Sequence, residues 1–153
     1  MTQLKKRSIW TLLIWSSALV GILIVFFSSG GPTTFLSGEQ RVTYSRVIIT
    51  AGFILYFTMY LLTRSQTSGP IIKDERDEHI TRRAYMISFH VILYFTFCCG
   101  AFLYWLYKIH KSSTVMPVGW VWVMALSGLC VGFISNSGAI LLLDRKMSGH
   151  AES

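Results

Sequence analysis

The side chains best suited to chemistry form one charged run near the middle of the chain. Residues 73–78 are six consecutive ionised side chains, and His79 follows them directly. On a helix Asp74 lies four residues before Glu78, and Glu75 lies four residues before His79, so each pair shares a face. Carboxylates and an imidazole are suitable metal ligands, but the spacing is not a Glu-x-x-His repeat, and the chain holds no second such motif. We therefore assign no metal ligands and expect no bound cofactor.

Three interpretations of this run stay open. The first is helix capping with exposed ion pairs, because acidic residues stabilise the start of a helix. The second is a surface that binds a protein partner or another copy of the chain, and the third is a metal site. We take partner binding as the leading functional prediction, with these candidate residues: Asp74, Glu75, Arg76, Asp77, Glu78, His79, Arg82 and Arg83.

A second group of polar side chains falls inside a long uncharged stretch. His90, Tyr94 and Cys98 follow one another at intervals of four, so a helix places them in one stripe. A histidine in such a stretch either bonds to a neighbouring helix or contacts a proton, a metal ion or haem. Together with the Gly/Ser/Asn face around Asn136, His90 would serve a small transporter or a channel-like oligomer, which is our first alternative. A metal- or haem-binding membrane protein is the second.

Small residues at helical spacing predict where helices approach closely. Gly128 and Gly132 are four residues apart, and Asn136 continues the same face. This pattern is typical of tight packing between membrane helices, with a polar side chain that bonds across the interface. Ser17 and Gly21 form a second such pair. Either packing within one chain or assembly of several copies would use these faces.

The absence of charge predicts the elements that must position these groups. The chain has 153 residues, of which 52% are hydrophobic and only 14% charged. No Asp, Glu, Lys or Arg occurs in residues 8–27, 47–63, 84–107 or 117–143. About 20 apolar residues suffice for a helix to cross the hydrocarbon core, so we predict an all-α membrane protein, a four-helix transmembrane bundle over residues 1–153. This excludes a soluble enzyme, a nucleic-acid-binding domain and a disulfide-stapled secreted domain, and we expect no enzymatic activity.

The distribution of basic residues predicts the orientation of the bundle. The N-terminus, the loop of residues 64–83 and the C-terminal flank of the last span carry ten Lys and Arg, whereas the other two loops carry four. Because basic residues stay on the cytoplasmic side, both termini are expected there. The net charge of +7 is explained by these flanking clusters, which attract membrane lipid, and we expect no nucleic-acid partner.

The charged run is expected to begin a long helix. No Pro or Gly interrupts the chain between residue 74 and Gly100, so one helix would run through residues 74–107. Residues 74–83, which we call the charged stub, would then project from the third span into the cytoplasm as two to three helical turns.

The stub also carries a resemblance. The sequence Glu75-Arg76-Asp77-Glu78-His79-Ile80, followed by Arg83-Ala84, resembles the Glu-Arg-Asp-Glu-Arg motif that follows the second span in a family of small four-span prokaryotic membrane proteins of unknown function. His79 departs from the motif, where the family usually has Arg. The resemblance implies a multi-pass protein of the cytoplasmic (inner) membrane of a prokaryote, with no established catalysis. Our leading prediction of function is a regulatory or accessory protein that binds its partner through the stub.

Overall fold

The computed structural model describes residues 3–28, 39–65, 75–110 and 117–149, and these residues are almost entirely helical. The α-helices are α1 (Gln3–Ser28), α3 (Glu39–Ser65), α4 (Glu75–Tyr104) and α5 (Val118–Gly149). A π-helical segment, η1 (Trp105–His110), continues α4. The prediction of an all-α fold with four long helices is confirmed.

All four helices are long and apolar enough to cross a membrane. The stretches that qualify are Leu4–Ser28, Val42–Leu62, Glu75–Lys108 and Val118–Lys146, with mean hydropathies of 2.3, 1.6, 1.9 and 1.8 at their most apolar. Each overlaps one of the four predicted spans over all but at most one of its residues. In the described part of the chain, the fold therefore fits a multi-pass membrane protein.

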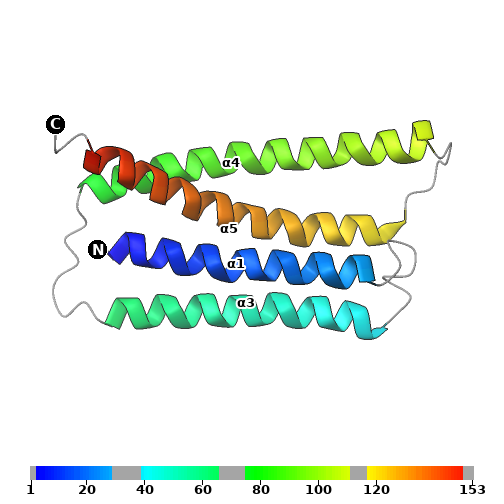
Figure 1. Ribbon diagram of the computed structural model, residues 1–153, viewed down its shortest axis with the longest axis horizontal. Helices are drawn as coiled ribbons and strands as arrows, with labels where there is room; N and C mark the ends of the chain where they lie inside the picture. The colour runs from blue at the N-terminus through cyan, green and yellow to red at the C-terminus, as the bar shows by residue number, and fades with distance from the viewer. Residues whose placement is uncertain (1–2, 29–38, 66–74, 111–116, 150–153) are drawn as a thin grey trace.

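The helices neighbour one another in the order α3, α1, α5, α4 (Figure 1). Extended contacts join α1 to α3, α1 to α5 and α4 to α5, while α3 and α4 share no contact of comparable extent in the described residues. The start of α1, the end of α3, the start of α4 and the end of α5 lie at the same end of the bundle. We call this the N-terminal end. The three basic segments of the sequence all flank these helix ends.

The packed interior is small. At its centre Trp15 is fully buried and stacks on Phe133 of α5, with ring centroids 4.4 Å apart and planes within 4°. Large apolar side chains point outward elsewhere, for example Phe97 at 75% and Leu142 at 71% exposure. Lipid tails solvate such side chains well, which is why a membrane bundle keeps apolar residues on its outer face.

A stripe of small residues on α4 packs against α5. Ala84 is fully buried against Ala139 and Ile140. One turn further, the Ser88 hydroxyl donates to the Gly132 carbonyl at 3.0 Å and lies 3.0 Å from the Ser135 hydroxyl. This interface extends into the charged stub, because Ile80 is also fully buried in the cluster that holds Ala84. The stub therefore packs against α5 through the side that carries Ile80, which we call its inner face.

Candidate functional site

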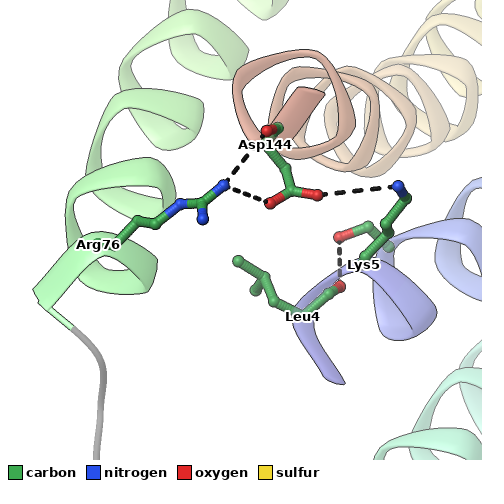
Figure 2. Close-up of polar contacts among 5 residues, drawn as sticks. Leu4, Lys5, Arg76 and Asp144 are labelled. Atoms are coloured by element: carbon green, nitrogen blue, oxygen red, sulfur yellow. Dashed lines mark hydrogen bonds and ion pairs between the residues drawn. The ribbon is translucent and has the colours of Figure 1, made fainter. Parts of the chain in front are cut away.

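A buried carboxylate fixes the charged stub to the rest of the bundle (Figure 2). The Asp144 side chain, near the end of α5, is only 10% exposed. Arg76 Nη2 donates to Asp144 Oδ1 at 3.2 Å and lies 3.4 Å from the Asp144 carbonyl oxygen. Lys5 of α1 approaches the other carboxylate oxygen at 3.9 Å. One acidic side chain thus joins the starts of α1 and α4 to the end of α5.

The rest of the stub divides into two faces. Its inner face carries Arg76 and Ile80 and lies against α5 and α1. Asp77 is half-buried, and its carbonyl oxygen accepts a hydrogen bond from the Thr81 hydroxyl at 2.7 Å. The outer face is exposed and holds five of the predicted residues, Glu75, Glu78, His79, Arg82 and Arg83. Asp74 lies outside the described residues.

This division separates two groups of candidate residues that the sequence treats alike. Acidic side chains stand at the first turn of the outer face and basic ones about a turn later, so the exposed surface carries both signs of charge. Because the opposite face is held by a buried ion pair and apolar contacts, the outer face is presented on an anchored helix. Binding of a partner to such a helix does not have to offset the conformational entropy that a mobile segment would lose on ordering.

The stripe of His90, Tyr94 and Cys98 points away from the bundle. All three side chains are exposed, Tyr94 at 69%. His90 Nδ1 lies 2.7 Å from the carbonyl oxygen of Met86, one turn earlier in the same helix. The histidine therefore bonds within its own helix, α4.

Replacing His90 by Phe is expected to leave stability nearly unchanged. The side chain is exposed and bonds only locally, so the free energy of unfolding should change by about 0.5 kcal/mol or less. Thermal unfolding in detergent, followed by helical circular dichroism, measures this. A loss of several kcal/mol would mean that a second copy or a ligand packs against His90.

The glycine pair of α5 lies in the interface with α4. A Cβ on Gly132 would stand 3.0 Å from Ile92 Cδ1, and one on Gly128 would stand 3.8 Å from the Phe95 ring. A Cβ on Gly21 would stand 3.5 Å from Ile48 Cδ1 of α3, whereas Ser17 is exposed and donates to the Ile14 carbonyl of its own helix. Three of the four small residues thus lie between helices of one chain.

Among the residues that the structure describes, no group of three or more His, Cys, Asp or Glu side chains stands close enough to hold a metal ion. The acidic residues of the stub spread around the helix, with Glu75 and Glu78 exposed and Asp77 half-buried. Their side chains do not converge on one point.

Asp144 did not figure among the predicted site residues. The sequence does hold a signal for this residue. Asp144 follows residues 117–143 directly, and no other acidic residue lies as close behind the C-terminal end of a predicted span. A carboxylate placed at the border of an apolar helix needs a cation nearby. Its actual partners lie far away in sequence, however, and only the packing of α1 and α4 on α5 identifies them.

The described fold defines a class, an all-helical protein with four helices able to span a membrane and a charged helix start docked at one end. Beyond the class, no family model, curated protein or solved structure matches this chain. The resemblance to the Glu-Arg-Asp-Glu-Arg family therefore stays a prediction from the motif.

Proposed function

We propose that the chain is a non-enzymatic regulatory or accessory protein of the cytoplasmic membrane of a prokaryote, with both termini in the cytoplasm. The membrane assignment is supported by four helices of sufficient length and apolarity. The orientation is supported by the ten-to-four bias of basic residues and by the three basic segments that flank one end of the bundle.

The proposed activity is binding of a protein partner through the outer face of the stub, Glu75, Glu78, His79, Arg82 and Arg83. One observation carries this proposal. The inner face of the same helix is anchored by Arg76 and Ile80, while the five charged and titratable side chains of the outer face are all exposed. A partner of complementary chemistry would place basic groups against Glu75 and Glu78 and acidic groups against Arg82 and Arg83.

Reversing both acidic charges of this face, Glu75→Lys with Glu78→Lys, is expected to remove the partner. Each reversal places like charges opposite the partner's basic groups, and such a juxtaposition costs several kcal/mol across an interface. Co-purification from native membranes in mild detergent, with the mass of the intact complex, measures the effect. We expect at least a tenfold loss of the partner that co-purifies with the unaltered chain.

The reversal is suited to this test because it adds positive charge to the flank that is already basic, so the topology should be retained. Lys108→Glu, an exposed charge reversal at the opposite end of the bundle, is a control for charge change itself. Equal recovery of the partner by the unaltered chain and by the double variant would refute binding through this face.

A further inference from the structure

A partly open cavity of about 240 Å³ lies at the N-terminal end of the bundle, apart from the outer face of the stub. All four helices contribute to its lining, including Arg7 of α1, Tyr56 and Tyr60 of α3, Tyr85 of α4 and Asn136 of α5. Tyr60 and Tyr85 are exposed, at 40% and 62%. Because α3 and α4 share no extended contact in the described residues, the cavity opens between them, toward the space that lipid would fill.

The polar groups of this cavity favour an anion. Arg7 is the cation among the lining side chains, and its guanidinium lies 5.2 Å from the centre of the Tyr60 ring. Tyr56, Tyr60 and Tyr85 bring three phenol hydroxyls, which can donate to a phosphate oxygen. Among the residues that the structure describes, no Asp or Glu lines the cavity. A guanidinium with hydroxyl donors from separate helices is a suitable environment for a phosphate group.

Asn136 adds a second requirement. In the described part of the chain, two buried side-chain atoms have no hydrogen-bond partner, Trp15 Nε1 and Asn136 Oδ1, and of these residues only Asn136 lines the cavity. An unsatisfied buried acceptor costs free energy, and more so where lipid replaces water. Because Oδ1 has no accessible surface in this structure, a ligand hydroxyl can donate to it only when the Asn136 side chain turns toward the cavity, and that bond would remove this cost.

The surroundings favour a lipid. The cavity is smaller than the roughly 300–1,000 Å³ of a site for a drug-sized ligand, so it would hold a headgroup rather than a whole lipid. Beside it, α3 and α4 expose apolar side chains such as Phe57 at 59% and Phe89 at 60%, along which acyl chains can lie. Basic pockets between membrane helices at the headgroup level are suited to anionic lipids.

We propose that this cavity binds the headgroup of an anionic glycerophospholipid, whose phosphate lies against Arg7 and the tyrosine hydroxyls and whose headgroup hydroxyl donates to Asn136 Oδ1 once that side chain turns toward the cavity. The site is separate from the outer face of the stub, so it does not depend on the proposed partner. A lipid bound in this cavity would contact both α3 and α4, two helices that share no extended contact in the described residues. The arrangement of these helices would therefore respond to anionic lipid.

Native mass spectrometry of the purified chain in detergent tests the proposal, with phosphatidylglycerol and phosphatidylcholine of identical acyl chains as probes. We expect at least fivefold greater retention of phosphatidylglycerol. Arg7→Gln should abolish this preference, while Lys6→Gln, which removes a neighbouring exposed charge outside the cavity, should keep it. Equal loss in both variants would show general attraction of anionic lipid to basic residues, and no preference in the unaltered chain would show that the cavity does not select anionic lipid. Either result would overturn the site.

Two gentler variants keep the test decisive if Arg7→Gln fails to fold, as judged by circular dichroism. Tyr85→Phe removes only a hydroxyl and should weaken retention two- to fivefold. Asn136→Leu should erase any preference for phosphatidylglycerol over phosphatidic acid, which lacks the headgroup hydroxyl. If Tyr85→Phe or Asn136→Leu leaves lipid binding unchanged, the assignment of the site is contradicted. Displacement of the lipid by millimolar inorganic phosphate, or by formation of a dimer, would instead indicate a free-anion site or a second copy.

Discussion

Asp144→Leu is expected to lower the free energy of unfolding by about 2–3 kcal/mol. The carboxylate is nearly buried and faces Arg76 and Lys5, so its removal leaves two cations against an apolar helix end with their main acidic partner gone. Loss of one partner of a fully buried pair costs roughly 3–5 kcal/mol. The expected value here is smaller, because the Arg76 and Lys5 side chains are 37% and 43% exposed and water screens part of the repulsion.

Unfolding in mixed detergent micelles, followed by tryptophan fluorescence, measures this effect. Glu78→Leu is the matched control, since it removes an exposed carboxylate from the same end of the bundle and should change stability by about 0.5 kcal/mol or less. Replacing Asp144 together with its nearer partner, Arg76→Met with Asp144→Met, should recover part of the loss, because only Lys5, which is 43% exposed, then loses its contact with the carboxylate. Equal losses for Asp144→Leu and Glu78→Leu would contradict a structural role for the ion pair.

Gly132→Leu is expected to separate α4 from α5 and to cost about 2–3 kcal/mol. Even a Cβ at this position would stand 3.0 Å from Ile92 Cδ1, so a Leu side chain must push Ile92 aside, and we expect the interface between α4 and α5 to widen. Overpacking of this kind typically costs about 1–3 kcal/mol. The displacement would also break the hydrogen bond from the Ser88 hydroxyl to the Gly132 carbonyl, and helix-to-helix bonds in membranes contribute about 0.6 kcal/mol on average.

Gly138→Leu provides the control for the same change in the same helix. A Cβ on Gly138 meets no atom within 4 Å, so the larger side chain should fit and the higher helix propensity of Leu should maintain or raise stability. Combining Gly132→Leu with Ile92→Ala should restore part of the loss by making room. If Gly132→Leu and Gly138→Leu behave alike in thermal unfolding, the close approach at Gly132 does not exist.

For the stub, the sequence predicted the helix but not its packing. The long helix that begins with acidic residues was predicted and is present, as α4 starts at Glu75 with Asp77 and Glu78 in its first turn. The sequence placed the stub as a projection into the cytoplasm. In the structure its inner face is docked, because α5 continues to Gly149 and α1 begins at Gln3, so both helices reach its level.

The cavity was not predicted at all. Its tyrosines and Arg7 lie on three different helices, and each is ordinary for the border of a membrane span. Their convergence depends on the neighbour order of the helices, which places α3 and α4 on either side of a cavity lined also by α1 and α5. Nothing in the spacing along the chain indicates that order.

By itself the sequence determined the four helices and the apolar stretch within each, because unpaired charges are excluded from a stretch that must lie in hydrocarbon and their absence is visible residue by residue. The helices extend beyond these stretches, as α3 does from Glu39 to Ser65. It also located the charged start of α4. Only the tertiary structure decided which face of each helix packs against another helix. These helices are apolar on nearly every side, so their pattern does not distinguish a face against lipid from a face against protein. The contacts of Asp144 with Arg76 and of Gly132 with Ile92 determine which faces of α4 and α5 pack together. With α4 in this orientation, the outer face of the stub is exposed.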